Sequence, residues 1–260
     1  MLNKLIKIDL RSTLKIAPIL FGIGFFFALV SFFFSKFGDS TIAEVIADIS
    51  KNFALSFAIS GFINVVTRAI GVFWKKLYSD ESYLTHTLPL SKKTIYLSKT
   101  LATIYSSLIA LFAAFIILVV NYNLFENFDA LKNFIEATAG VTGGNVVEFL
   151  VLIILVFFFE ITTLISVAFC VIILRHSTTN LKATLLSAGS YLAIQAIFLL
   201  SLFLIGLFNP EVMELFKNSD SVSADSMKII FYTAIIVYGL ATVVMNCRNI
   251  KLLEKGVNVA

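Results

Sequence analysis

The chain is poor in the residues that build a soluble protein surface. Only 14% of its 260 residues are charged and 59% are hydrophobic, whereas an average soluble domain has roughly 25% charged residues. This composition leaves too little polar surface to cover a soluble globule, so the sequence predicts that much of the protein faces lipid. Proline is scarce at 3 residues and phenylalanine abundant at 27, which suits long lipid-facing helices.

The sequence also lacks the patterns of common catalytic and metal sites. Its two cysteines, Cys170 and Cys247, fall within apolar runs and offer neither a disulfide framework nor metal-ligand spacing. No GxxxxGK[ST], HExxH, CxxC or GxSxG occurs, and His86 and His176 are the only histidines. We therefore expect no ATPase site in this chain, no catalytic residue, no metal site, no cofactor of its own and no nucleic-acid partner.

The sequence contains several long apolar runs instead of such motifs. Crossing a hydrocarbon core of about 30 Å takes around 20 apolar residues in a helix. Six runs meet this length: 16–35, 53–74, 100–120, 149–174, 183–208 and 229–246. The predicted fold class is an all-α integral membrane protein with six transmembrane helices, forming one transmembrane domain over residues 1–260.

The distribution of basic residues predicts the orientation. With both termini inside, the inner segments hold 15 Lys and Arg and the outer segments hold 5. Cytoplasmic loops carry such an excess, so both termini are expected in the cytoplasm.

The first fifteen residues, MLNKLIKIDLRSTLK, have helical periodicity. Basic residues recur on one face, at Lys4, Lys7, Arg11 and Lys15. Leu2, Leu5 and Ile6 lie roughly opposite. Residues 1–15 are expected to form an interfacial helix along the inner leaflet; the alternative is a basic anchor without helical order.

The longest inner loop carries the segment SDESYLTHTLPLS at residues 79–91. Ser79 suits a helix N-cap, and Asp80 and Glu81 suit the positive end of a helix dipole. Pro89 limits the helix, because the residue before a proline disfavours helical backbone. Its apolar face would consist of Tyr83, Leu84, Thr87 and Leu88. A short helix with such a face in water indicates a protein partner; the alternative is an ordinary solvated connection.

This loop resembles the cytoplasmic loop of permease subunits in the second ABC exporter superfamily, the type V exporter fold. The resemblance lies in an acidic pair, a Tyr-Leu, a Thr-Leu-Pro, and a basic stretch leading to Ser-Lys. The matching residues are Asp80, Glu81, Tyr83, Leu84, Thr87, Leu88, Pro89, Ser91, Lys92, Ser98 and Lys99. Relatives often have glycine where this chain has Ser82.

The resemblance implies that residues 79–88 form a coupling helix that docks on an ABC ATPase subunit, which holds ATP and Mg. It further implies a second permease copy or a paralogue as partner, in a bacterial cell membrane. In size and style the chain is similar to exporters of phenol-soluble modulin peptides in Gram-positive bacteria. An amphipathic or hydrophobic peptide is therefore the expected substrate, and membrane lipid a further partner.

Polar residues interrupt the predicted spans. Ser60, Asn64 and Arg68 recur at steps of four, and Glu160 and Gln195 lie in later spans. A carboxylate near the bilayer centre costs roughly 2.5 kcal/mol or more and usually faces protein or water. One interpretation places these five residues along a translocation path; the other makes them contacts between helices. Glu160 is alternatively protonated or paired with Arg68.

Three rival functions remain. A peptide-immunity permease would share the same fold. A gradient-driven secondary transporter would show internal repeats and broken helices, which the sequence lacks. An intramembrane enzyme would need an acid–histidine or serine–histidine pair at one depth, which the spans do not supply.

Overall fold

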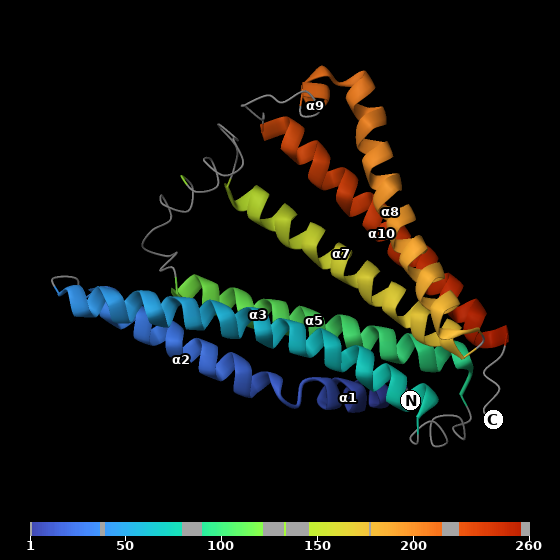
Figure 1. Cartoon of the computed structure of the whole chain (residues 1–260), viewed down its shortest axis with the longest axis horizontal. Helices are drawn as coiled ribbons and strands as arrows, with labels where there is room; N and C mark the ends of the chain where they lie inside the picture. The colour runs from blue at the N-terminus through green and yellow to red at the C-terminus, as the bar shows by residue number, and fades with distance from the viewer. Residues whose placement is uncertain are drawn as a thin grey trace. The chain divides into compact units, whose positions relative to one another are not determined.

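The computed structural model describes residues 2–36, 40–79, 90–121, 133, 146–176, 178–214 and 224–255. Within these residues every assigned element is a helix (Figure 1). Six of the helices are long and apolar enough to cross a membrane. They are α2 (Ala17–Lys36), α3 (Thr41–Tyr78), α5 (Lys92–Asn121), α7 (Val146–Arg175), α8 (Asn180–Phe208) and α10 (Ala224–Lys255). The prediction of an all-α protein with six candidate spans is confirmed.

Five of these six helices are longer than the apolar runs that predicted them, and α2 is as long as its run 16–35 but begins one residue later. The run 53–74 lies inside α3, which is 38 residues long and so measures roughly 57 Å at 1.5 Å per residue. Its first turns carry Glu44 and Asp48. A hydropathy pattern marks the length that crosses hydrocarbon, whereas the hydrogen-bonded helix continues until a residue or a contact ends it.

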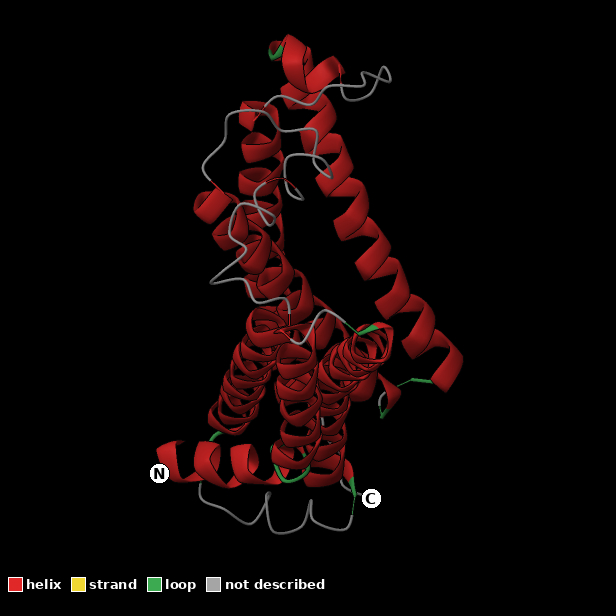
Figure 2. Cartoon of the chain, turned by 90° about the vertical axis from the view of Figure 1, so that its left-hand side faces the viewer, coloured by secondary structure: helices red, strands yellow, loops and turns green. Residues whose placement is uncertain are grey.

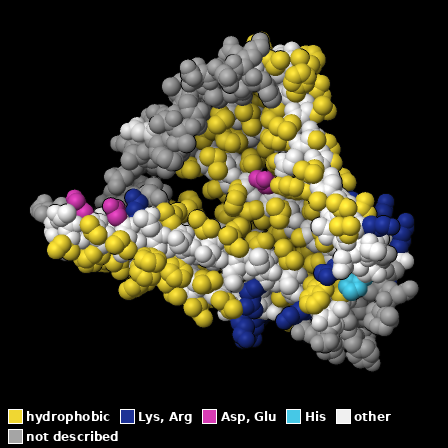
Figure 3. Space-filling view, in the orientation of Figure 1, with side chains coloured by type: hydrophobic (Ala, Val, Ile, Leu, Met, Phe, Trp, Pro, Cys, Tyr) yellow, Lys and Arg dark blue, Asp and Glu magenta, His cyan; other side chains and the backbone are white. Residues whose placement is uncertain are grey.

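Large hydrophobic side chains are exposed along these helices. They include Phe26 and Phe33 on α2, Leu192 on α8 and Leu240 on α10. Figure 3 shows hydrophobic side chains over much of the visible described surface. Apolar surface on this scale is not stable in water, so the packing supports a multi-pass membrane protein.

The chain divides into two compact units, residues 1–128 and residues 129–260. The prediction of one permease domain is not tested by this division, and each unit is described below by itself.

Unit 1 contains α1 (Leu2–Thr13), α2, α3 and α5. Small residues allow its long helices to approach closely. A Cβ placed on Gly61 of α3 would lie 2.9 Å from Phe21 Cε1 of α2. A Cβ on Gly24 would lie 3.0 Å from Ile117 Cδ1 of α5. The α2–α3–α5 packing therefore depends on the absence of side chains at these two positions.

Helix α1 runs across the long helices of unit 1 (Figure 2). It exposes Lys4, Lys7 and Arg11 and buries Asp9 and Thr13. On the face of unit 1 drawn in Figure 3, Lys and Arg gather near α1, and Asp and Glu are visible where α3 begins. A helix is confirmed for the N-terminal segment; its place at the membrane interface remains a prediction.

Unit 2 contains α7, α8, α9 (Pro210–Glu214) and α10. Its core includes Cys170 of α7, Ala183 and Ile194 of α8, and Tyr238 and Met245 of α10. A row of hydroxyl and amide contacts joins α7 to α10, including Thr163 Oγ1 to Thr242 Oγ1 at 2.9 Å.

Candidate functional site

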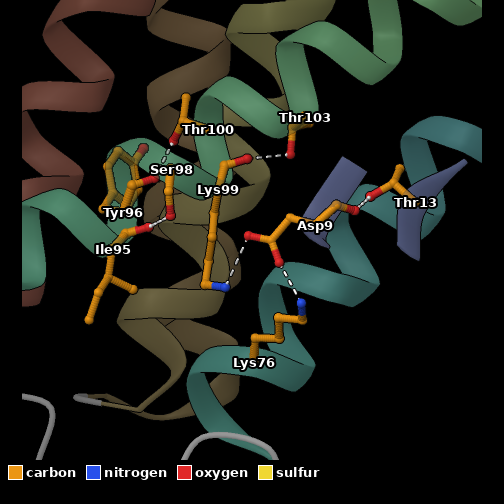
Figure 4. Close-up of polar contacts among 9 residues, drawn as sticks. All are labelled: Asp9, Thr13, Lys76, Ile95, Tyr96, Ser98, Lys99, Thr100 and Thr103. Carbon is orange, nitrogen blue, oxygen red and sulfur yellow. Dashed lines mark hydrogen bonds and ion pairs between the residues drawn. The ribbon is translucent and has the colours of Figure 1, made fainter. Parts of the chain in front are cut away.

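A buried ionic cluster joins three helices of unit 1 (Figure 4). Asp9 of α1 is 4% exposed. Its Oδ1 lies 2.5 Å from Lys76 Nζ of α3, and its Oδ2 lies 3.5 Å from Lys99 Nζ of α5. The Lys76 contact is a hydrogen bond, whereas the longer Lys99 contact is an ion pair only. One carboxylate on α1 therefore binds both α3 and α5.

The local sequence explains why α1 turns Asp9 inward. Asp9 and Thr13 are four residues apart and share one helix face, and Thr13 Oγ1 donates to the Asp9 carbonyl at 2.9 Å. Lys7 and Arg11 fall on the exposed side. Burying an ionised carboxylate is costly unless it is paired, so the two lysines are what make the inward position of Asp9 stable.

The face of α5 around Lys99 is lined by hydroxyl groups that bond to the helix itself. Thr100 Oγ1 donates to the Tyr96 carbonyl at 3.1 Å, and Thr103 Oγ1 donates to the Lys99 carbonyl at 2.9 Å. Tyr96 also packs edge-on against Phe73 of α3. Lys99 itself is 6% exposed. The carboxylate of Asp9 therefore meets Lys99 inside a packed interface.

The cavity beside this cluster is too small for a substrate. It has a volume of about 10 Å³ and is lined by Asp9, Phe73, Lys99 and Thr103, among others. A space of this size holds at most about one water molecule. The cluster is therefore suited to holding helices together and not to binding a ligand.

Arg68 provides a second connection to α1. Its Nη2 donates to the Ser12 carbonyl at 3.2 Å. The last carbonyls of a helix lack partners within the helix, so a guanidinium is well placed at the C-terminal turn of α1. Its Nε is buried without a hydrogen-bond partner among the described residues. The pairing of Arg68 with Glu160 would join the two units and remains a prediction.

The cluster lies at the base of the 79–91 loop. Helix α3 ends at Tyr78 and α5 begins at Lys92. Lys76 is therefore in the last turn before the loop, and Lys99 is two turns after it. The Ser91 Oγ accepts a hydrogen bond from the Thr94 backbone N–H at 3.2 Å, which is N-cap geometry for α5. Asp9 thus contacts both helices that carry the loop.

The predicted coupling residues themselves lie outside the described residues. These are Asp80, Glu81, Tyr83, Leu84, Thr87, Leu88 and Pro89. The coupling helix therefore remains a prediction.

The predicted polar stripe of α3 is partly outward-facing. Ser60 is exposed and Asn64 is half-buried, with the Asn64 Oδ1 buried and unpaired among the described residues. Nearby, Ser56 Oγ donates to the Asn52 carbonyl and Thr67 Oγ1 to the Ile63 carbonyl. Hydroxyls that bond their own helix are cheaper to place in lipid, so this face is compatible with lipid or with a partner.

In unit 2 the structure joins Gln195 of α8 to Tyr238 of α10. Tyr238 donates its hydroxyl to Gln195 Oε1 at 2.8 Å. Thr163 Oγ1 of α7 donates to the Tyr238 carbonyl at 3.1 Å. These two hydrogen bonds link α7, α8 and α10, and Glu160 lies half-buried on α7, one turn before Thr163.

Sequence reasoning missed two central residues, Asp9 and Tyr238. Asp9 stands alone among basic residues in the first fifteen positions, and that isolated acid was the available signal. Tyr238 offered a weaker one, as a tyrosine within a predicted span.

No three side chains among the described residues gather as metal ligands. His176 directly follows α7 and is largely exposed. The part of the ring that is buried and the neighbouring Arg175 charge both lower the pKa of His176. His86 lies outside the described residues. No family model, curated protein or solved structure matches the chain.

Proposed function

We propose that this chain is the membrane subunit of an ABC exporter. The proposal rests on the resemblance of the 79–91 segment to a coupling loop. The observation that carries it is the attachment of both helices flanking that loop to α1 through Asp9. A coupling loop must pass its movement to both flanking helices, and a shared contact at its base meets that requirement.

The cluster gives a mechanical route for coupling. A force on residues 79–88 reaches α3 near Lys76 and α5 near Lys92. Because Asp9 holds Lys76 and Lys99 together, the two helices and α1 respond as one body. ATP and Mg bind on the partner ATPase, whose closure supplies the force.

The proposed substrate is an amphipathic or hydrophobic peptide. Two permease chains, identical or paralogous, would form the path, with Ser60, Asn64 and Arg68 contributed by unit 1 and Glu160 and Gln195 by unit 2. Glu160 is half-buried among apolar neighbours on α7, which suits a site for cationic groups of a peptide. A peptide-immunity permease would use the same arrangement to clear a toxic peptide from the membrane.

A gradient-driven transporter is the second candidate, and the half-buried Glu160 of α7 is the observation that favours it. A carboxylate within a membrane span is typical of proton or cation sites in carriers. The two candidate functions predict different effects of the Glu160→Gln substitution. An ABC exporter keeps its ATP dependence in this variant, whereas a proton-coupled carrier loses its response to a pH gradient.

The deciding experiment is purification from native membranes in mild detergent, followed by mass spectrometry of retained proteins. Wild type is compared with a Tyr83→Arg, Leu84→Asp variant. The control is Leu181→Asp on α8, which changes an exposed apolar residue that is not part of the loop. We expect an ABC ATPase with wild type and the control and none with the loop variant. A folded wild-type preparation without any ATPase would exclude the proposal.

A further inference from the structure

The C-terminal half of α10 presents a basic groove, which we name the α10 groove. It has a volume of about 490 Å³ and is lined by residues of α10 alone among those described, including Val243, Val244, Cys247, Arg248, Lys251 and Lys255. Val244, Arg248, Lys251 and Lys255 are spaced 4, 3 and 4, so they share one helix face. The groove thus combines apolar residues at one end with three cations at the other.

The apolar end continues along the helix as an exposed stripe. Ile236, Leu240, Val243 and Val244 are each at least 60% exposed. From Ile236 to Val244 the helix rises about 12 Å, close to the roughly 15 Å of hydrocarbon in one leaflet. This stripe therefore matches the length of an acyl chain.

The cations begin one turn beyond the stripe. Arg248 follows Val244 by four residues, or about 6 Å, which equals the thickness of about one headgroup layer. Its Nη1 donates to Ser190 Oγ of α8 at 3.0 Å, and that hydroxyl donates to the Leu186 carbonyl. The guanidinium is therefore held in place one helical turn beyond the apolar stripe.

Charge at this end is unbalanced in favour of an anion. Glu254 is the acid nearest to Lys251 and Lys255 in sequence, and it is not among the residues lining the groove. A helix C-terminus favours cations through its dipole, but this effect is confined to the last turn and does not reach Arg248. Three cations beside an apolar stripe complement a ligand with one anionic end and one apolar end.

We propose that the α10 groove binds one anionic phospholipid of the inner leaflet. Its phosphate would contact Arg248, Lys251 and Lys255, and an acyl chain would follow the stripe from Val244 to Ile236. Basic sites next to the membrane favour anionic lipids by charge. The site is independent of the proposed transport function, because it involves neither the 79–91 loop nor Glu160.

The two cysteines offer a native reporter. Cys247 lines the groove and is exposed, whereas Cys170 is buried. A bound headgroup covers Cys247 and slows its alkylation by uncharged N-ethylmaleimide. The full-length protein is reconstituted in nanodiscs of phosphatidylcholine alone or with phosphatidylglycerol in equal amount, and the alkylation rates are compared.

The test variant is Lys251→Gln, Lys255→Gln, and the matched control is Arg175→Gln, Lys182→Gln. Both remove two exposed cations of unit 2. We expect phosphatidylglycerol to slow alkylation about tenfold in wild type and in the control, and less than about twofold in the test variant.

Native mass spectrometry of the same samples should show one phosphatidylglycerol retained by wild type and lost from the test variant. Free glycerol phosphate, added as a soluble competitor, should leave the protection unchanged, because the apolar stripe contributes to binding. Equal loss of protection in both variants would overturn the proposal and reduce the effect to general surface charge. Protection by glycerol phosphate alone would also overturn it, in favour of a soluble anion.

Discussion

Replacement of Asp9 by asparagine tests the buried cluster most directly. The side chains are nearly identical in shape, so the change removes charge and leaves packing intact. At 3.5 Å and an effective dielectric constant of about 20, one ion pair has a gross energy of about 5 kcal/mol. Removing one partner of a buried pair typically costs about 3–5 kcal/mol net. Because Lys76 is 17% exposed and retains some hydration, we expect a loss near the lower limit, about 3 kcal/mol in the free energy of unfolding.

Substitution of Lys99 should destabilise the protein less than substitution of Asp9. Lys99→Met leaves the Asp9–Lys76 hydrogen bond of 2.5 Å in place and replaces a buried charge with an apolar side chain, so it should cost less, about 1 kcal/mol. The double variant Asp9→Asn, Lys99→Met should be more stable than Asp9→Asn alone, because it also removes the more deeply buried of the two ammonium groups. Such non-additivity is the expected sign of a direct interaction.

Trp74 makes the measurement possible without a label. It is the only tryptophan in the chain and precedes Lys76 on α3 by two residues, so its fluorescence reports on this region. Denaturant titration in mild detergent gives the midpoints of the four proteins. If Asp9→Asn unfolds at the wild-type midpoint, or if Lys99→Met is the more damaging change, the ionic account of the cluster is wrong.

Further predictions concern packing and the polar cluster of unit 2. Gly61→Ala should destabilise unit 1 by about 1–3 kcal/mol, because its Cβ would meet the Phe21 ring at 2.9 Å. Gly71→Ala, whose Cβ would have nothing within 4 Å, should be neutral or stabilising by up to about 1 kcal/mol. Equal thermal midpoints for the Gly61→Ala and Gly71→Ala variants would contradict this expectation. Tyr238→Phe should cost about 1 kcal/mol by leaving Gln195 Oε1 without its donor, whereas Tyr232→Phe at an exposed site should unfold as wild type does.

Much of the fold could be predicted from the sequence, because lipid imposes a simple rule. A helix that crosses hydrocarbon needs about 20 apolar residues, and the six runs coincide with six helices of the structure, except that Ile16 precedes α2. The bounds were less predictable. The run 229–246 became Ala224–Lys255, since polar turns beyond the membrane continue the same hydrogen-bonded helix without any signal in hydropathy.

The candidate site could likewise be predicted only in part from the sequence. A periodic pattern places the basic face of residues 1–15 outward, and that is local information. Whether Asp9 is buried depends on Lys76 and Lys99, which are 67 and 90 positions away in sequence. The same holds for Arg68, which bonds to Ser12, and for Tyr238, which bonds to Gln195.

The sequence by itself thus determined that this protein faces lipid, that its fold is all-α, and where its candidate spans lie. These properties follow from composition and periodicity along one segment at a time. Only the tertiary structure decided which polar side chains meet. Their pairing depends on how helices rotate and pack against one another, and that is set by contacts such as Gly61 against Phe21, not by any pattern within a single helix.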